Sequence, residues 1–223
     1  MNYSMVMRLI GKDWYFQRTA ILLSLAGGAL SLGIVVLGGE AGFTIGLILL
    51  VSIMAMISAM MVMGNVIGER DNQTLPFVMS LPISYLEYTA SKILSNLIIF
   101  VPFWLAVTAG CLGLILVAPD IHGLFSFTVI MAVEILVSTC MMIAVAVVSE
   151  SKGWTIGAIM VGNLALNVVG YFVAHIPSIG NGLWKKAIYW SPAATMLLAI
   201  EFGLILAMLG LAFYLQSRKR DFI

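Results

Sequence analysis

Two carboxylic acids, Glu134 and Glu201, stand inside otherwise apolar runs of the sequence. If such a run crosses a membrane, a charge near its centre costs about 2.5–3.5 kcal/mol on insertion scales. Glu134 lies 11 residues into its run, about 16 Å deep at 1.5 Å per residue, and Glu201 lies about a turn and a half into the last run. Each carboxyl is therefore expected to be protonated, paired or directed at a polar cavity, which makes both candidates for a substrate path.

Four amides, Asn65, Asn96, Asn163 and Asn167, add to this set of polar side chains. Asn163 and Asn167 are four residues apart, so on a helix they share one face. One interpretation is that they extend the same path. The other is that they form hydrogen bonds between helices and only hold a bundle together, and the sequence leaves both open.

Motifs for catalysis and for cofactor binding are absent. The sequence has no Gly-x-x-x-x-Gly-Lys-Ser/Thr loop for ATP, no His-Glu-x-x-His metal motif and no Gly-x-Ser-x-Gly nucleophile motif. Cys111 and Cys140 fall at different depths of their runs, so a disulfide between them is not expected. We therefore expect no catalytic residue, no metal site and no cofactor in this chain.

The elements that carry these residues are apolar helices. Of the 223 residues, 62% are hydrophobic and 9% are charged, where soluble domains carry about 25% charged residues. This composition excludes a soluble enzyme and a disordered regulator, and the net charge of +1 gives no reason to expect nucleic-acid binding. The sequence predicts an all-α polytopic membrane protein, a single domain over 1–223. Its six spans are expected at 19–39, 43–67, 91–117, 123–149, 153–175 and 196–215.

The orientation follows from the basic residues, which concentrate on the cytoplasmic side of membrane proteins. One side of the six expected spans carries nine Lys and Arg residues and the other carries only Lys185 and Lys186. Both termini are therefore predicted to be cytoplasmic, in a multi-pass protein of the cytoplasmic membrane. Residues 1–18 are expected to form an interfacial helix, and 176–195 to form an outer segment embedded in the headgroup region.

The cytoplasmic segment 68–90 has the most informative pattern. Glu69, Arg70 and Asp71 open it as a group of charges, and residues 74–81 then form a short amphipathic stretch that ends at Pro82. Ser84 and Glu87 have the spacing of a capping box, which predicts the start of the next helix. A short helix joined to a span at each end could transmit force from a soluble partner.

The residues Glu69-Arg70, Thr74, Ser80-Leu81-Pro82-Ile83-Ser84 and Lys92 resemble the signature of the type-2 permease family of ABC transporters. The resemblance implies a permease that pairs with a second copy or a sister permease and with two separate ABC ATPase subunits, which bind ATP and Mg. It also implies that the short helix docks on the ATPase. The coupling residues would then be Glu69, Arg70, Thr74, Leu75, Leu81 and Pro82.

Three functions remain open at this point. The first is an ATP-driven exporter of an amphipathic or hydrophobic substrate, such as a peptide, an antibiotic or a lipid-like molecule. The second is an ion- or proton-coupled secondary carrier that uses Glu134. The third is a membrane protein without transport activity, such as an immunity or scaffold factor.

Overall fold

The computed structural model describes residues 3–71, 84–183 and 185–218, and within these ranges it contains helices and turns but no strand. Six of the helices described are long and apolar enough to cross a membrane. The protein is therefore an all-helical, multi-pass membrane protein. Its elements are α1 (Tyr3–Leu37), α2 (Gly39–Val62), the π-helix η1 (Met63–Ile67), α3 (Gly68–Asp71), α5 (Tyr85–Val117), the 3-10 helix η2 (Pro119–Leu124), α6 (Phe125–Ser149), α7 (Lys152–His175), α8 (Pro177–Gly180) and α9 (Pro192–Ser217).

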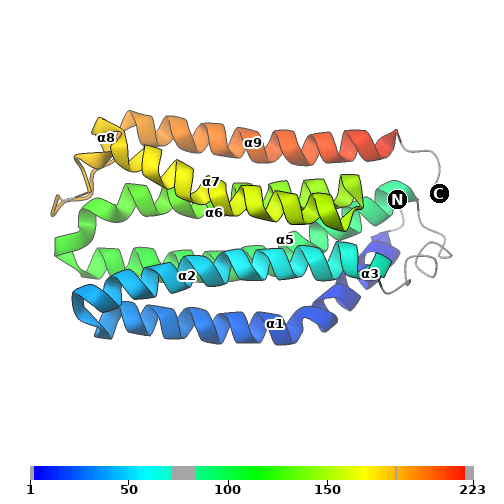
Figure 1. The fold of residues 1–223 in the computed structure, drawn as a ribbon, viewed down its shortest axis with the longest axis horizontal. Coiled ribbons are helices and arrows are strands. Elements are labelled where there is room, and N and C mark those ends of the chain that lie inside the picture. Colours follow the sequence, from blue (N-terminus) through cyan, green and yellow to red (C-terminus); the bar gives the residue numbers. More distant parts are fainter. Residues whose placement is uncertain (1–2, 72–83, 184, 219–223) are drawn as a thin grey trace.

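The long helices run side by side along one axis of the molecule (Figure 1). The start of α1 and the end of α9 lie at the same end of the bundle, which we call the terminal end; α3 and the start of α5 lie there too. The opposite end carries the α1–α2 turn, η2 and α8. An even number of spans places both ends of the chain on one side in this way.

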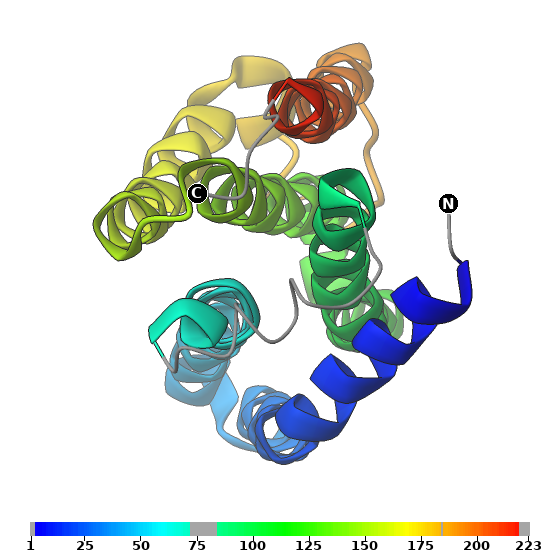
Figure 2. The same ribbon diagram turned by 90° about the vertical axis from the view of Figure 1, so that its right-hand side faces the viewer.

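Helix α6 forms the centre of the bundle. It packs against α9, α7, α5 and α2, and Figure 2 shows it between α5, α7 and α9. Two thirds of its apolar window is buried, the largest share among the six spans. A helix that is apolar on all sides is suited to this central position, since each face meets another helix.

The expected spans match six observed helices, but several boundaries differ. Helix α1 is continuous from Tyr3 to Leu37, so the expected interfacial segment 1–18 and the first span belong to one helix. Helix α9 begins at Pro192, four residues before the expected start, because Ser191 caps its first turn and proline is favoured at the first helical position. That the first turns of α1 lie in the membrane interface stays a prediction.

The beginning of α5 confirms the predicted capping box. Ser84 Oγ accepts a hydrogen bond from Glu87 N at 3.2 Å, and Ser84 N donates to Glu87 Oε2 at 2.8 Å. The helix therefore begins at Tyr85, six residues before the expected span. This start places Tyr88 and Lys92 on the helical stretch at the terminal end.

The first turns of α1 cross the terminal end of the bundle obliquely and reach α5 (Figure 2). Val6, Leu9, Ile10 and Asp13 are buried, which is the three- and four-residue spacing of one helix face. On the other side of the same stretch Trp14 and Phe16 are exposed. This crossing carries the polar residues of α1 over to α5.

Candidate functional site

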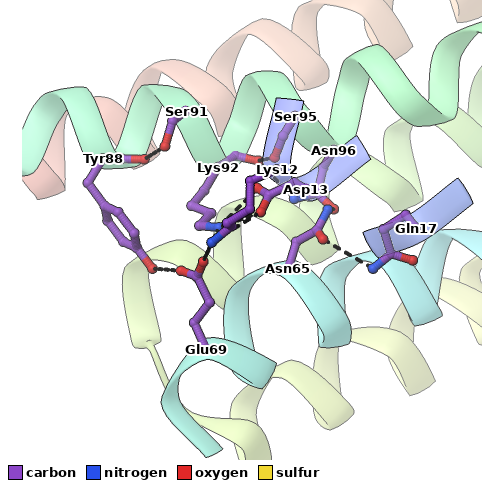
Figure 3. A network of polar contacts seen from close by, with 10 residues as sticks. All are labelled: Lys12, Asp13, Gln17, Asn65, Glu69, Tyr88, Ser91, Lys92, Ser95 and Asn96. Atoms are coloured by element: carbon purple, nitrogen blue, oxygen red, sulfur yellow. Dashed lines mark hydrogen bonds and ion pairs between the residues drawn. The ribbon is translucent and has the colours of Figure 1, made fainter. Parts of the chain in front are cut away.

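A group of buried and half-buried charged side chains lies at the terminal end of the bundle (Figure 3). It consists of Lys12 and Asp13 from α1, Glu69 from α3, and Lys92 with Tyr88 from α5; we call these five residues the charged cluster. Three segments that are far apart in the sequence therefore meet at one point. The cluster contains two cations and two anions, so its formal charge is zero.

Lys92 is the centre of the charged cluster. Its side chain is 0% exposed, and its Nζ lies 3.0 Å from Asp13 Oδ2 and 2.9 Å from Glu69 Oε1. Lys12 donates a hydrogen bond to the same Glu69 oxygen, and the Tyr88 hydroxyl donates to Glu69 Oε2 at 3.1 Å. A lysine is almost never fully buried unless it is paired, and here two carboxylates supply the pairing.

The electrostatics of Glu69 follow from these contacts. Burial alone would raise the pKa of its carboxyl, because a buried charge loses its hydration. The positive charges of Lys92 and Lys12, together with their hydrogen bonds, outweigh this effect and hold the pKa of Glu69 below its usual value. Glu69 is therefore a carboxylate at neutral pH, and the ion pairs are intact there.

The π-helix η1 connects α2 to this cluster. A π-helix is a widened turn that often occurs at functional sites, and η1 carries the buried residue Asn65 one turn before Glu69. Gln17 Nε2 donates to Asn65 Oδ1 at 3.1 Å, and Asn65 Nδ2 lies 3.5 Å from Asn96 Oδ1. Asn96 in turn donates to the Lys92 carbonyl at 2.8 Å, so a row of amides extends the cluster between α1, α2 and α5 (Figure 3).

The structure describes only part of the predicted coupling segment. The side chain of Glu69 is turned into the bundle, where it joins α3 to α1 and α5. Arg70 belongs to α3, but its side chain lies outside the described residues, as do Thr74, Leu75, Leu81 and Pro82 entirely. The contacts that these five residues make stay predictions.

The two intramembrane carboxyls lie on neighbouring helices, Glu134 on α6 and Glu201 on α9. Glu134 is 6% and Glu201 5% exposed, and the two side chains are near enough for the charge of one to act on the other. Glu134 and Glu201 each lie nine residues after the first residue of their helix. For Glu201 this position is deeper than expected, because α9 begins earlier than the expected span. α6 and α9 run parallel from the same end, so both carboxyls lie about 14 Å into the bundle.

The surroundings of this carboxyl pair are apolar. Val133, Val137 and Ile205, which neighbour the carboxyls along α6 and α9, belong to one buried apolar cluster, and Glu201 Oε2 has no hydrogen-bond partner among the described residues. A charge in such a place is costly because it loses its hydration.

The predicted amides of α7, Asn163 and Asn167, do not form hydrogen bonds with Glu134 or Glu201 among the described contacts. Asn163 donates to the Ile159 carbonyl and Asn167 donates to the Asn163 carbonyl, each at 2.9 Å and each within α7. Asn167 is exposed on the surface of that helix. These two hydrogen bonds are therefore local, and neither of them crosses to another helix.

Sequence reasoning missed Lys12, Asp13 and Tyr88 as members of a site. One signal was present: Lys12 and Asp13 are adjacent charges in a stretch whose other face is apolar. Their partners, however, are 57 and 79 residues away in the sequence.

Among the residues that the structure describes, no group of three or more His, Cys, Asp or Glu side chains could hold a metal ion. No protein-family model, curated protein or solved structure matches the chain. The likeness of segment 68–92 to type-2 ABC permeases therefore rests on its own residues.

Proposed function

We propose that this chain is the membrane-spanning permease subunit of an ATP-driven ABC exporter. It works with two separate ATPase subunits, which bind ATP and Mg, and with a second permease that is either another copy or a sister subunit. The terminal end of the bundle faces the cytoplasm, as the excess of Lys and Arg there favours.

The observation that carries this proposal is the ion pair between Glu69 and Lys92. These residues lie on the two sides of the segment 72–83, and they are the first and last residues of the signature that resembles the permease family. Both are tied to α1 through Lys12 and Asp13. A push on the segment would therefore reach α1, α2 and α5 together instead of one helix.

The energetics support a firm connection. Breaking a buried ion pair by displacing one partner costs about 3–5 kcal/mol, because it leaves an uncompensated buried charge. The charged cluster therefore resists separation of α1, α3 and α5 and acts as a joint between them. In this proposal Arg70, Thr74, Leu75, Leu81 and Pro82 contact the ATPase, and Glu69 holds the joint.

The substrate class follows from the composition of the spans. The bundle offers few ionisable groups apart from the carboxyl pair, so an amphipathic or hydrophobic molecule is the cargo that suits it. Export of a peptide, an antibiotic or a lipid-like molecule fits this chemistry.

The test begins with purification of the tagged full-length chain from native membranes in a mild detergent. A stoichiometric partner with a P-loop and ATPase activity is expected. Replacing Leu81 and Pro82 with alanine should leave folding intact and uncouple ATP hydrolysis from transport, and Glu69→Gln should weaken transport. Asp71→Asn is the matched control, because the Asp71 side chain is 50% exposed and pairs only with exposed Lys152 among the described residues.

A second candidate function is a proton-coupled carrier, favoured by the buried meeting of Glu134 and Glu201. It predicts transport without any ATPase and loss of transport in Glu134→Gln. A chain that purifies without a nucleotide partner and still transports along a proton gradient would overturn the exporter. A chain that binds an ATPase but transports no substrate would instead support the third function, a membrane protein without transport activity.

A further inference from the structure

We propose that Glu134 and Glu201 bind the basic group of the exported molecule, an amine or a guanidinium, so that the cargo is an amphipathic cation. The assignment rests on the exporter function and specifies the class of its substrate. The apolar part of the cargo lies in a groove between α6, α7 and α9.

Glu134 and Glu201 are buried without a cation of their own. Their side chains are 6% and 5% exposed, and Glu201 Oε2 has no hydrogen-bond partner among the described residues. In the part of the chain that the structure describes, α6, α9 and the helices packed against them carry Lys and His only near helix ends, at Lys92, His122, Lys152 and His175. In the charged cluster, by contrast, each buried carboxylate has a lysine beside it. Since a buried charge is costly unless it is paired, the two acids suit a positive group that arrives from outside the chain.

The arrangement of the two acids suits an amine or a guanidinium. α6 and α9 run parallel, and each acid lies nine residues after the first residue of its helix, so both lie at the same depth. A guanidinium or an ammonium carries several N–H donors and can donate to two carboxylates at once. Such charge-assisted hydrogen bonds would also satisfy the Glu201 oxygen that has no partner.

An apolar groove lies in line with the two acids. It has a volume of about 290 Å³ and is lined almost entirely by apolar atoms. Met141 and Met208 line the end that lies deepest in the bundle, and they follow Glu134 and Glu201 by seven residues, about two helical turns or about 10 Å. Seven residues return to almost the same side of a helix, so the acids and the groove share one face of α6 and one face of α9. An acidic end beyond an apolar groove complements a molecule with an apolar body and one basic end, whereas a neutral lipid chain or an apolar helix would leave the acids unpaired.

The acids are enclosed in this conformation. Val137 and Ile205 lie between them and the groove, and Ile130 and Ala194, both 0% exposed, belong to the apolar cluster on their other side. A basic group therefore reaches the acids only when α9 moves away from α6. In the exporter, the ATP-driven motion of the spans supplies this opening.

Photo-crosslinking with two matched probes tests the site. The full-length chain, with the ATPase that purifies with it, is placed in phosphatidylcholine nanodiscs with ATP and Mg, and adducts are mapped by mass spectrometry. One probe is an alkylguanidinium with a diazirine beside its basic group; the other is the alkylurea with the same diazirine, which has a similar shape and no charge. Relative to adducts at the exposed residue Leu206, we expect about ten-fold more guanidinium than urea adducts at Val133, Val137 and Ile205. Equal labelling by the two probes would overturn the proposal.

Substitution of the acids tests their roles. Glu134→Gln and Glu201→Gln keep the size of the side chain and remove the charge, so each should reduce guanidinium adducts about ten-fold and leave urea adducts unchanged. Asp120→Asn is the matched control, because its carboxylate is 78% exposed and pairs with the exposed Lys186, and it should change neither. Guanidinium labelling that persists in both Gln variants would overturn the proposal. If a Gln variant does not fold, the ratio of guanidinium to urea adducts in the unaltered chain still decides the question.

The results for this site and for the exporter are distinguishable. If no ATPase purifies with the chain but the guanidinium labels the chain alone and requires the two acids, the cation site stands and the exporter fails. If the complex hydrolyses ATP and exports the urea probe as fast as the guanidinium probe, the exporter stands and the cation site fails. Proton-driven transport without labelling by either probe would overturn both and favour the proton-coupled carrier.

Discussion

Lys92→Met is the most direct test of the charged cluster. The substitution keeps the length of the side chain and removes the charge that pairs with Asp13 at 3.0 Å and Glu69 at 2.9 Å. Of the two cations in the charged cluster, Lys12 then remains beside the two buried carboxylates, and its side chain is 35% exposed. Removing one partner of a buried pair costs about 3–5 kcal/mol. For a chain of this size each kcal/mol lowers Tm by about 2–4 °C, so we expect a loss of about 6–20 °C.

The two cysteines provide the assay. Cys111 and Cys140 are free and buried, so a fluorogenic thiol reagent reports unfolding of the purified protein as the temperature rises. Lys152→Met is the matched control, because its ion pair with Asp71 is exposed on both sides. Exposed pairs contribute about 0–1 kcal/mol, so this variant should lose no more than about 4 °C.

A double variant separates the ion pair from other effects of the substitution. Lys92→Met combined with Asp13→Asn removes one cation and one anion, so its cost should fall below the sum of the single costs by about 0.5–3 kcal/mol. If Lys92→Met and Lys152→Met shift Tm equally little, or if the two costs simply add, the cluster does not hold the terminal end together and the reasoning fails.

Three other predictions follow from the described contacts. Gly123→Ala should lower Tm clearly, because the new Cβ would clash with the Gly182 carbonyl oxygen, and an unchanged Tm would contradict this close approach. Ser84→Ala should cost about 0.5–2 kcal/mol through loss of the bond to Glu87 N, measured as the same thermal shift. The pKa of Glu69 is lowered on folding, so its contribution to stability is complete above pH 4.5 and is lost as the pH falls through the folded value. Glu69→Gln should remove this acid-dependent loss of Tm, and an unchanged pH profile would refute the assignment.

The local features of the fold could be predicted from the sequence. Hydropathy of consecutive residues defines each span, and the spacing of Ser84 and Glu87 defines the start of α5; both depend only on neighbours in the chain. Boundaries were less predictable where a helix extends beyond the apolar core, as α1 and α9 do. Backbone hydrogen bonding continues past the last apolar residue of a span, so hydropathy alone does not predict where the helix ends.

The partners of the charged residues were decided by tertiary structure. The sequence by itself determined that Glu134 and Glu201 lie in apolar spans and that Lys92 and Glu69 stand at the two sides of one polar segment. Only the packing of α6 beside α9, and the oblique course of α1 over α5, brings the carboxyls together and encloses Lys92. The physical reason is that the free energy of a buried charge depends on partners many residues away, whereas helix formation and membrane burial depend on the local chain.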